Sequence, residues 1–521
     1  MALTSEIGLS KYKWTSDKEV HVVGFIWQNG EYVAGKELHN FISKSSRSFN
    51  EFKTTVSSLN GQFSVVVQKE SKTWLLCSHT WSYPVFYLQN SKRISISDDP
   101  QILLEQLQNP EIDVFSRSYF LLFGVTPQNA TLVKQISQVK AGEIVVLTDI
   151  QSRKISVFNV AHKSPAREQG EEELYQTILS LFERYFKYVK NKQVLLPLTR
   201  GYDSRLLACL LKEFGHKNVL CATWGRKGNT EVPTAQKVAE KLGFPHVFVE
   251  YNSELISGFS KKDVFLDYAR FAGHFSSMPF LQDYFAIDYL KRNKIISTET
   301  VALPGHSGDY FAGSHLDLSM DNVSSEYLMS KIETQYSSAY PVDSKQLKEI
   351  ENHITEEFLI TKDAKPWQKF EKWDFEERQC KFISNSNQAW SFFGIEVMMP
   401  LFDRELIEFF ENIPFHMKLG ATYYNQTLEN RFFIPQKVNF DLKEKQVPKP
   451  SVMKWKNFMV KVSPRFIKHL YYPVNDSIFY REITTELVQL DLNKKYKHPT
   501  RPHKYNAYIT QWYLKLLEDS L

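Results

Sequence analysis

The chain has 521 residues, of which 42% are hydrophobic, 24% charged and 14% aromatic, and its formal net charge is +5. This length predicts two or more domains, and the apolar fraction excludes a wholly disordered chain. No apolar run approaches the roughly 18 residues of a membrane-spanning helix, and the start, with its early Glu6, is not a secretory signal. The four cysteines form no CxxC pair, which favours a reducing cytosol over a disulfide framework or zinc site.

Residues 19–160 are predicted to form an antiparallel, β-rich domain. Short runs rich in β-branched and aromatic residues alternate there with Gly, Asn, Asp, Ser and Lys clusters. The predicted strands are 20–27, 61–68, 74–79, 85–89, 93–97 and 143–147. Two helices are predicted in this part, at 101–108 and 113–123.

The periodicity changes after residue 160. Apolar runs that start near 194, 219 and 246 leave room for one helix in each gap, and we expect helices at 203–214 and 231–242. This alternation predicts a parallel sheet with right-handed crossovers. Beyond about 260 the chain is predicted to be mostly helical, and the domain boundary is placed near 160–170, which gives domains 1–165 and 166–521.

The C-terminal segment 441–521 is basic, with 12 Lys and 3 Arg against 8 Asp and Glu. Basic tails can bind nucleic acid or phosphates, and a soluble helical surface with a Lys-rich face gives the same composition. We favour the helical surface.

The strongest local motif is a predicted strand, 194–198, followed by a tight loop, 199–202, and a helix that opens at Asp203 and Ser204. A helix N-terminus presents free backbone N–H groups to an anion such as pyrophosphate. Arg200 can add a positive charge and Asp203 an oxygen ligand for Mg²⁺. An ordinary strand–helix turn capped by Asp203 is the alternative. The GxxxxGK[ST] and GxGxxG nucleotide motifs are absent.

A second Gly-rich turn follows the apolar run that ends at Leu303, and it exposes His306, Ser307 and Asp309. Loops that follow parallel strands cluster at the carboxyl edge of the sheet, where ligands bind. Asp309 is therefore predicted to face Asp203 across one cleft, and two carboxylates there suit a magnesium–triphosphate. Such turns also occur with no function beyond the turn itself.

Together these loops resemble the adenylating domain of asparagine synthetases and the related β-lactam synthetases and lasso-peptide cyclases. The family's ATP pyrophosphatase loop, S-G-G-x-D-S, corresponds to residues 199–204, with Thr199 for Ser and Arg200 for the first Gly. The family's second loop, G-E-G-x-D-E-x-F-G-G, corresponds to residues 305–314.

A third block, 394–414, is similar to the family's G-x-E-x-R-x-P-F-x-D. Glu396, Pro400 and Asp403 match this pattern, while Met398 stands in place of the Arg. The N-terminal segments also resemble the glutaminase-type fold that precedes these synthetases; they are 59–67, 82–87, 95–104 and 136–147. The resemblance fades beyond about 435.

The resemblance implies an α/β protein: a β-rich, Ntn-hydrolase-like α+β sandwich, then a parallel-sheet ATP-pyrophosphatase domain with a helical C-terminal part. It implies ATP and Mg²⁺, with Asp203 and Asp309 as the metal ligands. The nucleotide-binding residues implied are Leu198, Thr199, Gly201, Tyr202, Ser204, Trp224, Pro304 and Gly305. Arg200 is expected to contact phosphate.

Besides Arg200 and Met398, three further positions depart from the family or extend it. The family's glutaminases use a cysteine at residue 2 as nucleophile, but this chain has Ala2, so we expect no glutamine hydrolysis. His306 replaces the Glu of asparagine synthetases and the Tyr of β-lactam synthetases, and it is either a base for the incoming amine or a turn residue. Lys449, between two prolines, is the candidate for the lysine that stabilises the later transition state in β-lactam synthetases.

The predicted function is therefore a cytoplasmic, AMP-forming ligase that adenylates a carboxylate and transfers it to an amine or ammonia. The expected substrates are small molecules or peptides that carry a carboxylate or an amine. No membrane partner is expected and nucleic acid is disfavoured as a partner, while assembly of the chain into a homodimer is left open. Within this class, a natural-product or peptide cyclase and a surface-polysaccharide amide-forming enzyme stay open. The alternatives outside it are an RNA-modifying ATP pyrophosphatase and a degenerate ATP-binding scaffold.

Overall fold

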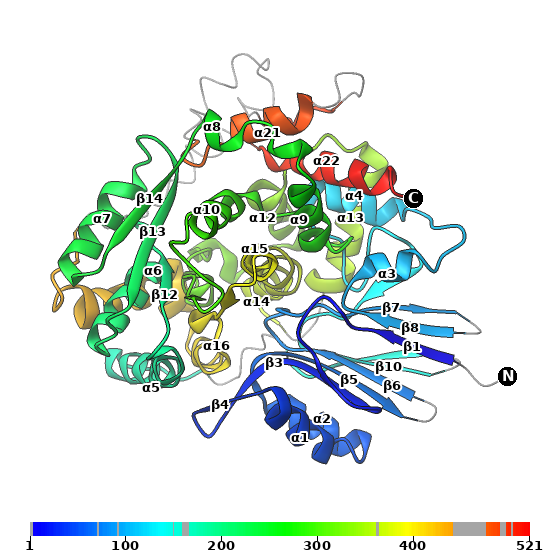
Figure 1. Cartoon of the computed structure of the whole chain (residues 1–521), viewed down its shortest axis with the longest axis horizontal. Helices are drawn as coiled ribbons and strands as arrows, with labels where there is room; N and C mark the ends of the chain where they lie inside the picture. The colour runs from blue at the N-terminus through cyan, green and yellow to red at the C-terminus, as the bar shows by residue number, and fades with distance from the viewer. Residues whose placement is uncertain are drawn as a thin grey trace.

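The computed structural model describes residues 4–69, 72–90, 93–148, 151–158, 166–360, 364–440, 476–489, 496–501 and 504–521. Figure 1 shows a stack of two mostly antiparallel sheets formed by the N-terminal part of the chain and a parallel sheet wrapped by helices formed by the rest. No helix in these ranges has both the length and the apolar character that crossing a bilayer requires.

The N-terminal part contains two sheets that lie face to face between layers of helices (Figure 1). The larger sheet has the strand order β11-β10-β6-β5-β3-β2, with β4 on β3, and the smaller has the order β1-β8-β7-β9. The strands are β1 (Thr4–Gly8), β2 (Thr15–Ser16), β3 (Val20–Gln28), β4 (Glu31–Ala34), β5 (Asn60–Lys69), β6 (Lys72–Cys77), β7 (Phe86–Gln89), β8 (Arg93–Ser97), β9 (Ile136–Gln138), β10 (Glu143–Leu147) and β11 (Ser152–Ser156).

Alternation along the strands explains this layering. Val66 and Leu75 belong to the core between the two sheets, whereas their neighbours Val65 and Leu76 belong to the core under helices α1 (Gly35–Ser45) and α2 (Phe49–Ser58). Successive side chains of a strand point to opposite faces, so an apolar run fills two cores at once. All strand pairs of the two sheets are antiparallel except β1–β8.

The strands expected in this part are confirmed, but the prediction missed α1 and α2. The second of these begins with a Ser48 side-chain cap and carries Phe52 and Val56 on its buried face. Of the two helices that were expected, α4 (Val114–Phe123) is confirmed, while α3 (Pro100–Leu104) ends earlier than the predicted 101–108.

The second half contains the predicted parallel sheet, with the strand order β14-β13-β12-β15-β16. Its strands are β12 (Val194–Pro197), β13 (Val219–Arg226), β14 (His246–Tyr251), β15 (Val301–Ala302) and β16 (Glu396–Val397). Helix α6 (Tyr202–Glu213) connects β12 to β13, and α7 (Glu231–Leu242) connects β13 to β14. The predicted alternation of strand and helix is thus confirmed over residues 194–251.

Helices make up most of the remainder, as expected. The α-helices are α5 (Glu171–Val189), α8 (Ser253–Ile256), α9 (Asp263–Gly273), α10 (Leu281–Arg292), α11 (Gly308–Phe311), α12 (Ser325–Tyr336), α13 (Ser344–Ile354), α14 (Pro366–Trp373), α15 (Gln388–Phe392), α16 (Arg404–Glu411), α17 (Phe415–Lys418), α18 (Thr422–Leu428), α21 (Tyr480–Gln489) and α22 (Asn506–Glu518). The 3₁₀ and π segments are η1 (Phe259–Lys261), η2 (Leu318–Asp321), η3 (Thr355–Leu359), η4 (Asp374–Ile383), η5 (Ser384–Asn387), η6 (Pro400–Phe402), η7 (Leu419–Ala421) and η8 (Glu429–Phe433).

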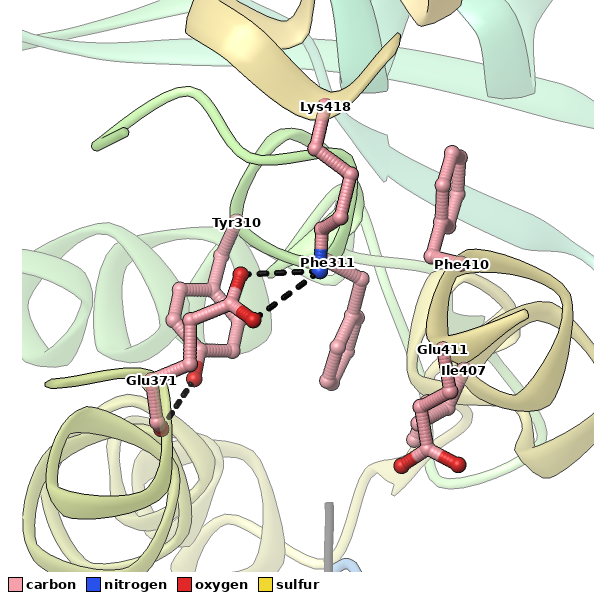
Figure 2. A pocket seen from close by; sticks show the side chains of 7 residues that line it. All are labelled: Tyr310, Phe311, Glu371, Ile407, Phe410, Glu411 and Lys418. Atoms are coloured by element: carbon pink, nitrogen blue, oxygen red, sulfur yellow. Dashed lines mark hydrogen bonds and ion pairs between the residues drawn. The ribbon is translucent and has the colours of Figure 1, made fainter. Parts of the chain in front are cut away.

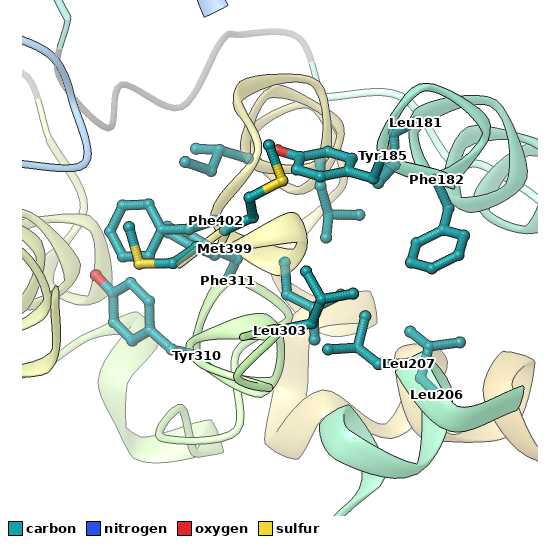
Figure 3. Packing of buried hydrophobic residues seen from close by; sticks show 14 of the residues in the cluster. Leu181, Phe182, Tyr185, Leu206, Leu207, Leu303, Tyr310, Phe311, Met399 and Phe402 are labelled. Carbon is teal, nitrogen blue, oxygen red and sulfur yellow. The ribbon is translucent and has the colours of Figure 1, made fainter. Parts of the chain in front are cut away.

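One hydrophobic core joins the parallel sheet to the helices around it. Leu181 of α5, Leu207 of α6, Leu303 after β15 and Phe311 of α11 are all buried in it, and Figure 3 shows these side chains gathered together. Because the two loops of interest follow β12 and β15, this core holds both of them from behind.

The third motif block has a structural role at the junction of the two halves. Asp403 caps α16 and forms a buried ion pair with Arg184 at 2.7 Å, and it also accepts from Tyr185 and from Asn60 of β5. Glu396 accepts from the Tyr188 hydroxyl, and Met398 is fully buried.

The predicted boundary near 160–170 falls partly on residues 159–165, outside the described residues, and stays a prediction.

Candidate nucleotide-binding site

The first loop, between β12 and α6, is held by its own side chains. The Thr199 N–H donates to Ser204 Oγ and the Gly201 N–H donates to Thr199 Oγ1, both at 3.1 Å. The Arg200 N–H donates to Glu231 Oε2 at 2.7 Å. The loop therefore has a fixed shape, and a phosphate here would compete with the Glu231 carboxylate for an amide.

The second loop lies directly against the first because β12 and β15 are neighbouring parallel strands. A Cβ on Gly305 would lie 2.7 Å from the Ser204 nitrogen, and one on Gly308 would lie 2.9 Å from Asp203 Oδ1. At Gly305 the close atoms belong to the backbone, so glycine is needed there for the two loops to meet; at Gly308 they belong to the Tyr424 and Asp203 side chains, which a Cβ would displace.

Asp203 and Asp309 lie next to each other, but neither lines the cavity described below, so their predicted placement across one cleft stays a prediction. The Asp309 N–H donates to Asp203 Oδ2 and the Tyr424 hydroxyl donates to Asp203 Oδ1, each at 3.0 Å. Asp203 is 8% exposed. Burial, and then the nearby Asp309 carboxylate, raise the pKa of Asp203 to about 8.

These two carboxylates fit a magnesium ion that is also bound by phosphates. A buried carboxyl group, Asp203, beside a half-buried one, Asp309, is electrostatically unfavourable without a cation, and Mg²⁺ prefers oxygen ligands. In the described ranges no group of three or more His, Cys, Asp or Glu residues could hold a metal alone. Mg²⁺ is commonly held by one or two protein carboxylates, with water and substrate phosphate in its other positions.

The raised pKa of Asp203 predicts a pH effect on stability. Between about pH 4 and 8 folded Asp203 keeps its proton while the unfolded chain has lost it, so stability falls as the pH rises. Without divalent cations, the melting temperature of the wild type should fall more steeply from pH 5 to 8 than that of Asp203→Asn. Asp321→Asn, which removes an exposed carboxylate, should match the wild-type slope. Equal slopes for wild type and Asp203→Asn would contradict the shift.

A cavity of about 460 Å³ opens beside the two loops. Seven of the eight predicted nucleotide-binding residues line it: Leu198, Thr199, Gly201, Ser204, Trp224, Pro304 and Gly305. Its size suits a small-molecule ligand, since such sites commonly measure about 300–1,000 Å³.

The other predicted site residues are placed as follows. The eighth, Tyr202, does not line the cavity; its hydroxyl donates to Glu429, and its ring packs on Phe433. Arg200 does not line it either, although its buried Nε has no hydrogen-bond partner among the described residues. Lys449 and Ala2 lie outside the described residues, and what was expected of them stays a prediction.

His306 lines the cavity from the second loop. Its Nε2 lies 3.4 Å from Ser386 Oγ of η5, and burial lowers the pKa of His306 to about 4. The imidazole is therefore neutral at physiological pH and is able to accept a proton as a weak base.

The first cysteine of the chain, Cys77, is buried in β6, where burial raises its pKa to about 12, so it is not a nucleophile.

A buried ion pair supports the second loop from behind, as Figure 2 shows. Lys418 Nζ lies 2.8 and 3.0 Å from the two oxygens of Glu371, and both side chains are 2% exposed. The Tyr310 hydroxyl donates to the Glu371 carbonyl, and the backbone of Lys418 lies against Gly313. The space between these residues has no room for water, so this is packing and not a second binding site.

The sequence did not reveal several residues that line the cavity. They are Pro197, Ala222, Thr223, Asn229, Glu231, Gln282, Asp283, Ser477 and Ile478. Asp283 lies in the first turn of α10, where an acidic residue is commonly explained by the helix dipole, so its position along the chain gives no sign of a cavity.

Comparison with known proteins agrees with the motif resemblance. Residues 188–430 match the family model described as asparagine synthase. These residues, which include both loops and the third block, therefore form an asparagine synthase-family domain, as predicted. A search among curated proteins finds no significant match.

Several solved structures share weak similarity with the chain. The NH3-dependent NAD synthetase of Campylobacter jejuni is 14% identical over 38% of this chain and 80% of its own, with a TM-score of 0.20. The U34-tRNA thiolase NcsA of Methanococcus maripaludis is 15% identical over 64% and 88%, with a TM-score of 0.24. The NMN synthetase of Francisella tularensis is 12% identical over 48% and 97%, with a TM-score of 0.20. Scores this low say nothing about activity.

Proposed function

We propose that the chain is an ATP- and Mg²⁺-dependent, AMP-forming ligase that joins a carboxylate to an amine. The observation that carries this is the juxtaposition of the two loops, in which the Asp309 N–H bonds Asp203 beside a cavity lined by both loops. The asparagine synthase-family domain at residues 188–430 supports the use of ATP.

The first step forms an acyl-adenylate. A carboxylate oxygen of the substrate bonds to the α-phosphorus of ATP, and the bond to pyrophosphate breaks. Leu198, Trp224 and Pro304 would hold the nucleoside, and the loop from Thr199 to Ser204 would face the phosphates. Asp203 and Asp309 would hold Mg²⁺, which when bound neutralises phosphate charge.

The second step forms the amide. The amine nitrogen attacks the acyl carbon and AMP leaves, so the nitrogen must lose a proton. His306 is the one imidazole among the described residues that line the cavity, it is neutral at physiological pH, and we assign it as the proton acceptor. With Ala2 in place of the cysteine nucleophile, glutamine would not supply the nitrogen, and the amine would be free in solution or part of a small-molecule or peptide substrate.

ATP–pyrophosphate exchange against a panel of carboxylates tests the proposal. Exchange that requires both Mg²⁺ and one class of carboxylate is expected, and no ammonia should be released from glutamine. Binding of ATP without exchange for any carboxylate would instead indicate a scaffold. A gel shift with tRNA would favour the RNA-modifying alternative.

A further inference from the structure

One buried carboxyl group lines the cavity but has no role in the reaction as described. Asp283 reaches the cavity from α10, an element separate from both loops, and is only 5% exposed. Its Oδ1 accepts from Trp224 Nε1 at 3.1 Å. Its Oδ2 has no hydrogen-bond partner within the part of the chain that the structure describes.

The neighbouring hydroxyl groups do not satisfy Oδ2. Tyr251, Tyr268 and Tyr480 lie close to Asp283, because burial and then the Asp283 charge raise the pKa of each of them. The Tyr251 and Tyr268 hydroxyls donate to the carbonyls of Gln282 and Phe280, and among the described residues no hydrogen bond joins Tyr480 to Asp283. Because the carboxyl group lines the cavity, a ligand that displaces water from this oxygen without offering a donor costs free energy. Since burial also raises the pKa of Asp283 to about 7, the group is poorly solvated, and a ligand donor would remove part of this cost.

The surroundings indicate what kind of donor this is. Leu198, Trp224, Pro304 and Ile478 give the cavity apolar surfaces suited to a planar ring, and Asp283 adds an acceptor held in place by the Trp224 indole. An exocyclic amine lies in the plane of its ring and donates N–H bonds. A keto oxygen at the same ring position has no hydrogen to donate. It and the ionised carboxylate both accept hydrogen bonds, so no bond forms between them and the two oxygens repel each other.

We propose that Asp283 accepts a hydrogen bond from the exocyclic amine of adenine and thereby selects ATP over 6-keto purine nucleotides. This inference rests on the proposed use of ATP at this site. A residue that hydrogen-bonds one base discriminates strongly against an analogue that lacks the partner group, because the buried acceptor is then left unpaired.

Titration calorimetry with the full chain and Mg²⁺ tests this. At about pH 8.5, where Asp283 is ionised, the wild type should bind ATP about 10- to 100-fold more tightly than ITP, which is the range expected for one hydrogen bond to a charged group. Purine riboside triphosphate, which lacks the amine, should bind as weakly as ITP, and this comparison needs no variant. Asp283→Asn, whose amide both donates and accepts, should reduce the ATP/ITP ratio to a few-fold. Asp288→Asn, on the same helix but away from the cavity, should keep the wild-type ratio.

Four results would overturn the assignment. An unchanged ATP/ITP ratio in Asp283→Asn, or equal wild-type affinity for ATP and purine riboside triphosphate, would show that Asp283 does not contact the amine. Tighter binding of GTP than ATP would assign the site to guanine. If the wild type bound 2′-deoxy-ATP more weakly than ATP and Asp283→Asn bound the two equally, Asp283 would contact the ribose instead. In these cases ATP–pyrophosphate exchange by the wild type would still support the proposed ligase, whereas a wild type that binds no nucleotide would end both proposals.

Discussion

Asp309→Asn is expected to lower the rate of ATP–pyrophosphate exchange by on the order of 10²-fold or more, which corresponds to about 2.7 kcal/mol of transition-state stabilisation. Asparagine keeps the size of the side chain and removes one charge. The backbone contact from the Asp309 N–H to Asp203 Oδ2 does not need the Asp309 carboxylate, so the two loops should stay together. The loss would then come from metal binding and not from the fold.

Asp203→Asn should have a similar effect, and the double variant should be little worse than either single one, because ligands of one ion act as a unit. Asp321→Asn is the matched control, since it removes an exposed carboxylate from η2, outside the cavity lining. Thermal melts check that each variant is folded. Near-normal exchange in Asp309→Asn would mean that the second loop is only a turn.

Sequence reasoning succeeded where the chain alternates regularly. Apolar runs separated by one amphipathic helix predicted β12, β13 and β14 with α6 and α7, and this order places the first loop at the carboxyl edge of the sheet. The second loop was found because it also follows an apolar run. That run, β15, pairs with β12, and the two loops therefore touch.

Predictions failed where tertiary contacts decide a residue's role. Helix α2 contains Thr54, Thr55 and Val56, which favour strands, and it is stabilised by burial of Phe52 against the sheet. The role of Asp283 depends on Trp224 of another element, and no local pattern shows that contact.

The third block shows a related limit of motif reasoning. Glu396 and Asp403 match the family pattern, yet both contact α5: Glu396 accepts from Tyr188, and Asp403 pairs with Arg184. A motif match identifies residues that the family shares, but it does not separate those at the cavity from those that hold the halves together.

Lys418→Met is expected to cost about 3–5 kcal/mol of stability, the usual penalty for removing one partner of a buried ion pair. Glu371 would lose the Lys418 ammonium in a site where both partners are 2% exposed and the adjoining space has no room for water, and His315, 3.4 Å from Glu371 Oε1, would remain beside it. Chemical denaturation measures the change as a shift of the unfolding midpoint. Lys187→Met is the control, because its pair with Glu183 is more than half exposed and should contribute about 0–1 kcal/mol.

The double variant Lys418→Met with Glu371→Gln should regain much of the lost stability, because it removes the uncompensated charge as well as the pair. Its catalytic activity should recover together with its stability. The Tyr310 hydroxyl bonds the Glu371 backbone carbonyl, which both substitutions preserve, so the second loop should stay in place and exchange should recover with the fold. If the double variant were stable but had lost exchange, the Lys418 charge would act on the cavity itself, and the pair in Figure 2 would belong to the site.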